Sequence, residues 1–299
     1  MKLIAQIVGG IVLVIVMALL TVFVFSTQAL NRVVEYSDTS PPIPKDSASI
    51  ARGRHLARAI GKCVDCHGDD LGGMVLADQM PFARLVGPNL TTGRGGIAAD
   101  RTDDDYLRAI RHGIGVGGRA LVLMPAKAYW HMGDDDVAAL VAYLRSVPPV
   151  DRELPPSEFG LVGRFALLRG ELDAMFDAKD MDHMARRSAP PAPDSTADYG
   201  RYLANIGGCT HCHGPTLSGG PIPSGPPDGR PAANLTPEAI GAWTEADFFK
   251  ALREGVRPNG TPIDSTQMPI RMTREMTDLE TKAVFKYLQS VPAKATGGR

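Results

Sequence analysis

The sequence has few cysteines, few aromatic residues and no excess of charge of either sign. It contains 32 Lys and Arg residues against 33 Asp and Glu, so its formal net charge is -1. This balance argues against a nucleic-acid-binding protein, because such proteins usually show a strong basic excess. Aromatic residues make up 6% of the chain, which is sparse for the two domains that 299 residues allow. A large prosthetic group could supply the missing apolar bulk.

Alternating strand patterns are also weak throughout the chain. Glycine and proline are frequent instead, with 32 and 24 residues, which indicates loop-rich domains with few strands. Apolar residues reach 44% of the chain, so there is material for real cores. We therefore expect a mainly α fold.

An uncharged apolar segment runs from Leu3 to Phe25. As a helix it would span roughly 35 Å, more than a bilayer core of about 30 Å. A cleaved secretion signal is the alternative, but its apolar region is usually only about 7–15 residues long and ends near an Ala-x-Ala site. We expect residues 1–27 to form a membrane anchor and residues 28–46, with their three prolines, to form a tether. In either interpretation, the rest of the chain is exported across the membrane.

The remaining sequence repeats itself once, at an offset that stays between 142 and 147 residues. The matched strings keep their order, so we predict one duplicated domain. The copies occupy residues 47–150 and 195–299, and a linker occupies residues 151–194. The paired strings begin at Gly53 and Gly200, Cys63 and Cys209, Leu71 and Leu217, Asn89 and Asn234, Arg111 and Arg253, Met124 and Met268, and Tyr143 and Tyr287.

Each copy predicts about three helices joined by long loops. The first helix runs into the cysteines. The second begins at a capping pattern, Thr102 or Thr244 with an Asp three residues on. The third begins near Asp134 in the first copy and near Thr277 in the second.

The linker predicts an amphipathic helix with one apolar face. We interpret it as a helix packed across both domains, and a partner-docking surface is the alternative. The face consists of Leu161, Phe165, Leu168, Leu172 and Phe176.

Two pentapeptides use all four cysteines. Cys63-Val64-Asp65-Cys66-His67 and Cys209-Thr210-His211-Cys212-His213 both read Cys-x-x-Cys-His, the attachment signature of c-type haem. Two thiols about one helical turn apart can each bond a vinyl group of one porphyrin, and the adjacent histidine then faces the iron. Disulfides, a redox dithiol and zinc are alternatives, but a redox pair does not require the histidine twice, and neither copy offers zinc a second conventional pair nearby. The motifs predict two covalently bound haem c groups, with His67 and His213 as iron ligands.

Met124 and Met268 are the candidates for the second axial ligand. Both precede a proline and hold matching places in the repeat. Methionine opposite histidine stabilises ferrous iron and raises the potential. Met80 also precedes a proline but has no counterpart in the second copy, and Met272 lacks the proline. His112 remains an alternative ligand, although a helix-terminal histidine ordinarily caps backbone carbonyls.

Arg111 and Arg253 recur at matching places in the two copies. Arginine pairs well with carboxylates, so both are candidate partners of the haem propionates. Ordinary surface pairing is an equally good interpretation.

These motifs together resemble the cytochrome c subunits of membrane-bound alcohol, aldehyde and gluconate dehydrogenases. The resemblance covers both repeats and is best in the second, where Asn234-Leu235-Thr236 and Trp243-Thr244-Glu245-Ala246-Asp247-Phe248 stand. It implies two tandem class I-type cytochrome c domains, each with about three helices round one haem, besides the N-terminal transmembrane helix. Such subunits commonly carry three haems, and their usual Pro-Ala-Met-Pro is altered in both copies here. The resemblance therefore implies a dihaem relative.

Such a protein would transfer electrons rather than act as an enzyme by itself. Electrons would enter from a dehydrogenase or respiratory partner and leave to quinone, another cytochrome or an oxidase. The anchor would lie in the inner membrane, with the haem domains facing the periplasm. A dihaem peroxidase, which needs an open iron site and acid–base residues, and a free shuttle on its tether are the alternatives.

Overall fold

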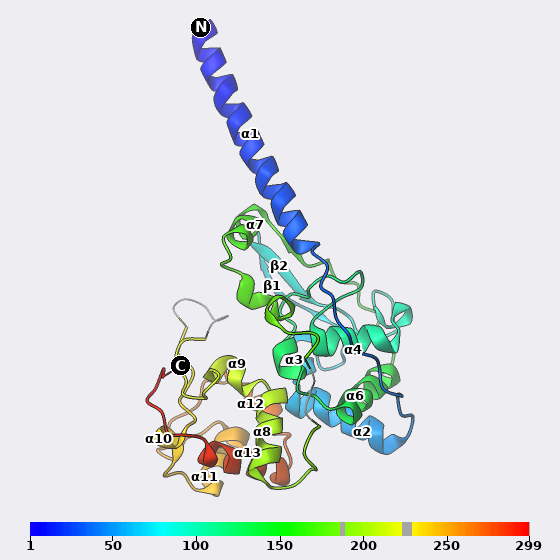
Figure 1. The fold of residues 1–299 in the computed structure, drawn as a ribbon, viewed down its shortest axis with the longest axis vertical. Coiled ribbons are helices and arrows are strands. Elements are labelled where there is room, and N and C mark those ends of the chain that lie inside the picture. The colour runs from blue at the N-terminus through cyan, green and yellow to red at the C-terminus, as the bar shows by residue number, and fades with distance from the viewer. Residues whose placement is uncertain (186–188, 223–228, 299) are drawn as a thin grey trace.

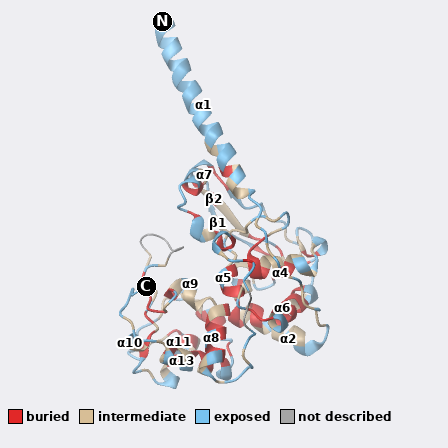
Figure 2. Cartoon of the chain, in the orientation of Figure 1, coloured by how far each residue is buried: buried red, intermediate tan, exposed pale blue. Residues whose placement is uncertain are grey.

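The computed structural model describes residues 1–185, 189–222 and 229–298. Helix α1 (Lys2–Leu30) protrudes from a body made of two small helical domains, shown in Figure 1. Among the described residues, α1 is the helix long and apolar enough to cross a membrane. Almost all of its side chains are exposed, as Figure 2 shows.

Domain 1 follows the predicted order of helices. Helix α4 begins with a capping box in which Thr102 and Asp105 satisfy each other's backbone amides, so its predicted start is confirmed. The domain contains α2 (Ser47–His55) continued by the π-helical η1 (Leu56–Ile60), α3 (Cys63–His67), η2 (Ala98–Asp100), α4 (Asp103–His112), α5 (Ala126–Tyr129) and α6 (Asp134–Ser146).

Domain 2 repeats this arrangement. Capping boxes at Thr244 and Thr277 open its two longer C-terminal helices, as the sequence predicts. Its helices are α8 (Ala197–Ile206), α9 (Cys209–His213), α10 (Pro237–Ile240), α11 (Glu245–Glu254), α12 (Ile270–Thr273) and α13 (Asp278–Ser290).

The first and last helices of each domain cross at a glycine. A Cβ on Gly53 would lie 1.9 Å from the carbonyl oxygen of Ala139 in α6, and a Cβ on Gly200 would lie 1.9 Å from that of Ala283 in α13. Any side chain would therefore push the helices apart. This close approach explains why both copies hold glycine there.

A small antiparallel sheet, which the sequence analysis did not predict, is added to domain 1. Its strand order is β1 (Met74–Gln79), β2 (Ala83–Gly87) and β3 (Glu158–Phe159). The burial of β1 does not alternate along the strand, and its register shifts between Val75 and Ala77. The period-2 signal of a half-buried strand is therefore missing.

The linker helix packs against α1 and the sheet, so the expectation that it spans both domains is wrong. Helix α7 (Leu161–Leu168) is followed by Gly170 at φ 76° and by the short turns η3 (Asp173–Met175) and η4 (Asp177–Asp180). The apolar positions beyond Leu168 therefore do not continue the face of α7. They lie in a separate core formed by Ala83, Phe159, Ala166, Leu167, Leu172 and Phe176.

Much of the predicted tether lies against domain 1. The amide of Val34 donates to the Gly118 carbonyl at 2.8 Å, and the amide of Ser40 donates to the Asp104 carboxylate at 2.9 Å. We call residues 33–40 the strap. Because the strap is hydrogen-bonded at both ends, it links α1 to domain 1 through a defined path.

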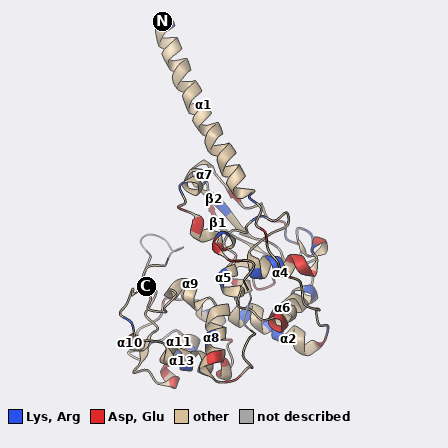
Figure 3. Cartoon of the chain, viewed as in Figure 1, with Lys and Arg blue, Asp and Glu red and all other residues tan. Residues whose placement is uncertain are grey.

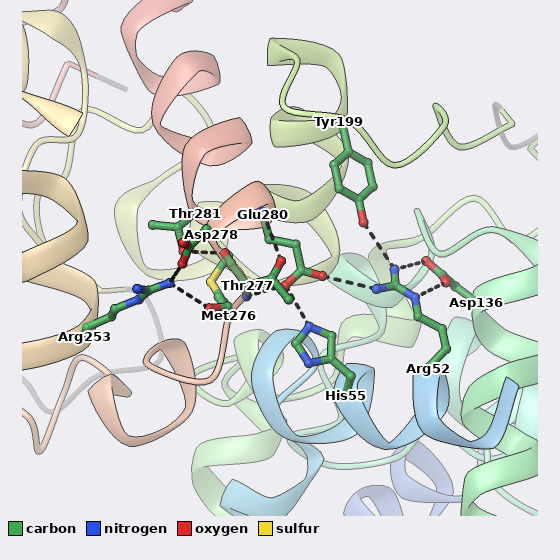
Figure 4. Close-up of polar contacts among 10 residues, drawn as sticks. All are labelled: Arg52, His55, Asp136, Tyr199, Arg253, Met276, Thr277, Asp278, Glu280 and Thr281. Atoms are coloured by element: carbon green, nitrogen blue, oxygen red, sulfur yellow. Dashed lines mark hydrogen bonds and ion pairs between the residues drawn. The ribbon is translucent and has the colours of Figure 1, made fainter. Parts of the chain in front are cut away.

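The two domains face each other through matching surfaces. His55 Nε2 lies 2.7 Å from Glu280 Oε2, and the Tyr202 hydroxyl donates to Asp136 Oδ2 at 2.6 Å. His55 corresponds to Tyr202 in the repeat, and Asp136 corresponds to Glu280. Arg52 joins the two contacts by donating to both carboxylates, at 2.9 Å and 3.2 Å, as Figure 4 shows for most of this network. The interface is therefore approximately two-fold, with corresponding residues of the repeat used on both sides.

Candidate functional site

A single cavity of about 1420 Å³ is lined by both Cys-x-x-Cys-His motifs. Its other walls come from both domains and consist largely of apolar side chains. None of the four cysteines forms a disulfide, so all four thiols remain available at the cavity wall. The predicted residues that line it are Cys63, Cys66, His67, Met124, Cys209, Cys212, His213 and Met268.

Each motif forms one isolated helical turn. Lys62 and Gly208, just before the motifs, have left-handed φ values of 55° and 70°. Gly68 and Gly214 follow the turns with φ near 80° and ψ of 160° and 165°, a backbone conformation that is essentially restricted to glycine. Cysteines three residues apart lie on the same side of such a turn, which is the arrangement that attachment of one porphyrin requires.

The two motif histidines are oriented by backbone carbonyls. His67 Nδ1 lies 2.9 Å from the Pro88 oxygen, and His213 Nδ1 lies 2.7 Å from the Ala233 oxygen. A carbonyl can only accept, so Nδ1 must carry the proton and Nε2 keeps its lone pair. Burial lowers the pKa of both imidazoles and outweighs the opposing effect of the carbonyls. Both imidazoles are thus held neutral, with Nε2 in a state that can bind a metal.

The structure places Met124 and Met268, but neither rival methionine, at the cavity. The prolines that follow them cap α5 and α12 with nearly the same backbone angles, φ -79° and ψ 60° in one copy and φ -76° and ψ 60° in the other. Met80 is exposed, and Met272 is buried in the core. Neither of these two belongs to the cavity-lining set found among the described residues.

Arg111 and Arg253 are engaged away from the cavity. The guanidinium of Arg111 is fully buried and donates to the Asp134 carboxylate at 2.6 Å, and that of Arg253 donates to Asp278 at 2.5 Å. Each therefore ties its own helix to the start of the domain's last helix, which accounts for their recurrence. Within the described part of the chain, the arginines at the cavity are Arg101, Arg230 and Arg257. The sequence repeat could not reveal these three arginines, because they do not occupy matching positions in the two copies.

His112 also lies outside the cavity lining of the described chain. It is fully buried, with Nδ1 3.0 Å from His183 Nδ1 and Nε2 3.2 Å from the Asp38 carboxylate of the strap. Its side chain thus connects the end of α4 to the strap and to the linker. His211 is the further histidine that lines the cavity.

A lysine links the two motif loops across the domain boundary. Lys62 Nζ donates to the Gly207 carbonyl at 2.5 Å and to the Ile60 carbonyl at 3.1 Å. Burial lowers the pKa of Lys62, although the neighbouring thiols and Asp65 act in the other direction. Because Lys62 immediately precedes one motif and Gly207 lies two residues before the other, this contact links the two motifs directly.

Comparison with known families accounts for both halves of the chain. Residues 48–144 match the family described as "Cytochrome C oxidase, cbb3-type, subunit III", and residues 197–292 match "Cytochrome c". This chain is a c-type cytochrome with two tandem cytochrome c domains. The cytochrome therefore carries two covalently bound haem c groups, and the cavity with its four thiols and two oriented imidazoles fits them.

Several curated proteins resemble this cytochrome over most of its length. It is 29% identical to the fructose dehydrogenase cytochrome subunit of Gluconobacter japonicus over 89% of this chain and 57% of the relative. It is 30% identical to the gluconate 2-dehydrogenase cytochrome c subunit of Pantoea cypripedii over 83% of this chain and 61% of the relative. It thus spans about three fifths of each of these two subunits. A protein named "Diheme cytochrome c-type" from Cereibacter sphaeroides is 27% identical over 83% of this chain and 87% of its own.

Proposed function

We propose that this cytochrome is a membrane-anchored electron-transfer subunit. It accepts electrons from a dehydrogenase and passes them to a downstream acceptor such as a quinone, another cytochrome or an oxidase. The observation that carries the proposal is the single cavity lined by both motifs. Haem iron, when bound, supplies a reversible one-electron change. The names of the relatives, which include cytochrome subunits of two dehydrogenases, support a dehydrogenase as the donor.

The cavity residues have distinct roles in this proposal. His67 and Met124 bind one iron, and His213 and Met268 bind the other. Methionine ligation and burial by apolar side chains raise the potentials. The cavity arginines are the candidate partners of the propionates, since guanidinium groups pair well with carboxylates. They are Arg101, Arg230 and Arg257.

Helix α1 is proposed as an uncleaved anchor in the inner membrane, with the haem domains on the periplasmic side. It carries no charge between Leu3 and Leu30, as Figure 3 shows. Its C-terminal end is built into the body, because Ser26 is fully buried and accepts a hydrogen bond from Arg164 at 2.9 Å. Removing α1 would break these contacts, which supports retention of the segment.

The two alternatives receive less support from the geometry. A free shuttle requires a loose connection, whereas the strap is hydrogen-bonded to domain 1 at Val34 and Ser40. A peroxidase requires an open iron site. With Met124 and Met268 both at the cavity, each iron has a candidate sixth ligand.

Purification of the tagged full chain from native membranes in mild detergent tests the proposal. The untagged strain serves as the control for adventitious binding. We expect a stoichiometric dehydrogenase, whose substrate reduces both haems in the isolated complex. Recovery of an oxidase or quinol-oxidising complex without a dehydrogenase would instead show that the protein connects two respiratory complexes. A clean monomer that no substrate reduces would contradict the subunit assignment.

A further inference from the structure

Helix α7 presents an apolar face to the outside of the molecule. Leu161, Val162, Phe165 and Leu168 are between 40% and 53% exposed, and their spacing puts them on one side of the helix. The exposed Met80, in the turn between β1 and β2, extends this surface, because the Val162 amide donates to the carbonyl of the residue after Met80 at 3.2 Å. Contiguous exposed apolar surface of this kind commonly marks a binding surface.

The position of α7 identifies what covers this face. Arg164, at the edge of this face between Leu161 and Leu168, donates to the hydroxyls of Ser26 and Thr27 in α1, and its guanidinium lies 4.6 Å from the centre of the Phe23 ring. Figure 1 shows α7 at the end of the body from which α1 emerges, with domain 2 at the opposite end. The apolar face of α7 is thus continuous with the exposed apolar surface of α1.

The length of α1 places α7 at the membrane surface. At 29 residues, α1 is about 44 Å long, whereas the hydrocarbon core is about 30 Å thick. If the core begins near Leu3, it ends near residue 22. Phe23 to Leu30, and α7 beside them, then lie at the level of the headgroups, where in-plane amphipathic helices bind.

We propose that α7 is an in-plane membrane helix whose apolar face, together with Met80, sits in the headgroup–acyl boundary of the bilayer. This inference rests on the proposed anchoring by α1. The opposite side of α7 is fixed to the protein by Ala166 and Leu167, which are buried in the core beneath the sheet. Two attachment points, α1 and α7, then set the tilt of the body and hold domain 2 away from the membrane.

Apolar burial rather than charge holds α7 on the lipid. Arg164 is committed to α1, and Arg169 donates to Glu171 at 2.6 Å. Each guanidinium therefore has a partner within the protein, and the charge of the exposed Arg169 is balanced by that of Glu171. Insertion of α7 should accordingly persist when anionic lipid is omitted or salt is raised, in contrast to an electrostatic surface contact.

Thiol accessibility in vesicles tests the proposal with the full haem-loaded chain. The native cysteines are bonded to haem, so one introduced cysteine is the sole free thiol. The positions are Phe165→Cys and Val162→Cys in α7, Val14→Cys in α1, and Leu279→Cys as an exposed apolar control in α13 of domain 2. Each variant is reconstituted in phosphatidylethanolamine and phosphatidylglycerol vesicles and treated with a membrane-impermeant maleimide. For each variant, the rate at which the maleimide labels the reachable molecules is divided by the labelling rate of the same thiol after denaturation.

We expect the α7 and α1 thiols to react about tenfold more slowly than the Leu279→Cys thiol, because lipid covers them. Fast reaction in α7 with protection in α1 would overturn the α7 inference and leave the anchor intact. Fast reaction at Val14→Cys would overturn the anchor and the inference with it. Protection of α7 in native membranes but not in pure vesicles would show that a protein partner covers this face, and would also overturn the inference.

Discussion

Glu280 offers the sharpest perturbation of the domain interface. It is only 3% exposed, and its carboxylate lies 2.7 Å from His55 Nε2, 3.2 Å from Arg52 Nη1 and 3.0 Å from the Thr277 amide (Figure 4). Burial acts to raise the pKa of Glu280. The hydrogen bond and charge of His55, with the Thr277 amide and Arg52, outweigh burial and lower the pKa from 4.5.

Replacing Glu280 with Gln removes the charge and keeps the shape. Hydrogen bonds to charged groups contribute about 1.5–3 kcal/mol, and the amide oxygen can still accept one of them. Breaking a buried ion pair can cost about 3–5 kcal/mol when the partner charge is stranded. Here Arg52 keeps both hydrogen bonds to Asp136, at 2.9 Å and 3.1 Å, so the full cost is not reached. We expect the free energy of unfolding to fall by about 2 kcal/mol near neutral pH.

The pH dependence of this loss follows from the direction of the pKa shift. The folded pKa of Glu280 is below its unfolded value of 4.5. Its contribution is therefore fully present above about pH 4.5 and disappears as the pH falls through the folded pKa. The difference between wild type and Glu280→Gln should shrink on acidification below pH 4.5.

Guanidinium unfolding followed by Soret absorbance at several pH values measures these differences. Glu238→Gln is the matched control, because Glu238 also lies in a first helical turn but is exposed. This control substitution should change the free energy of unfolding by no more than about 0.5 kcal/mol. A loss for Glu280→Gln no larger than that of the control, or a loss independent of pH, would refute the reasoning about this interface.

Four further substitutions test the iron ligands, the helix crossing and the contact between the motif loops. Met124→Ala and Met268→Ala should each make one haem high-spin and lower its reduction potential, because the thioether ligand is lost. An unchanged ferric absorption spectrum would refute the assignment of that methionine as an iron ligand. Gly200→Ala places a Cβ 1.9 Å from a carbonyl oxygen of α13 and should cost more than about 2 kcal/mol of unfolding free energy, whereas Gly10→Ala, with open space around it, should have no measurable effect. Lys62→Gly removes the hydrogen bond between the motif loops, but it also relieves the strain of a lysine in a left-handed backbone conformation. We expect the free energy of unfolding to fall by about 1 kcal/mol as the net result. An equal or higher free energy of unfolding would contradict a stabilising role for the contact.

The features predicted from the sequence depend on local or repeated signals. The helix starts at Thr102 and Thr244 follow from capping boxes that need only four consecutive residues. The two cytochrome c domains follow from the duplicated motif. The recurring Gly53 and Gly200 indicated a shared feature, which the structure identifies as a helix crossing.

The features that were missed or mispredicted depend on contacts between distant segments. The strap is held by pairs such as Val34 with Gly118, and α7 is fixed to α1 by Arg164 and Ser26, which no local pattern reveals. The same applies to Arg111, whose recurrence was compatible with a propionate contact, whereas the structure shows its buried guanidinium bonded to Asp134 at the start of α6. Recurrence shows that a residue has a common role in both copies, and only the fold shows which role.

Circular dichroism in the Soret band of the purified full chain tests the central claim most directly. Both motifs line one cavity, and the Lys62 contact and the Glu280 network hold the two domains together, so we expect the bound haems to lie close enough for their transitions to couple. We predict a bisignate Soret signal that collapses when the domains are unfolded. A spectrum equal to the sum of two independent haem signals in the folded protein would contradict the shared cavity, which is the observation that carries the proposed function.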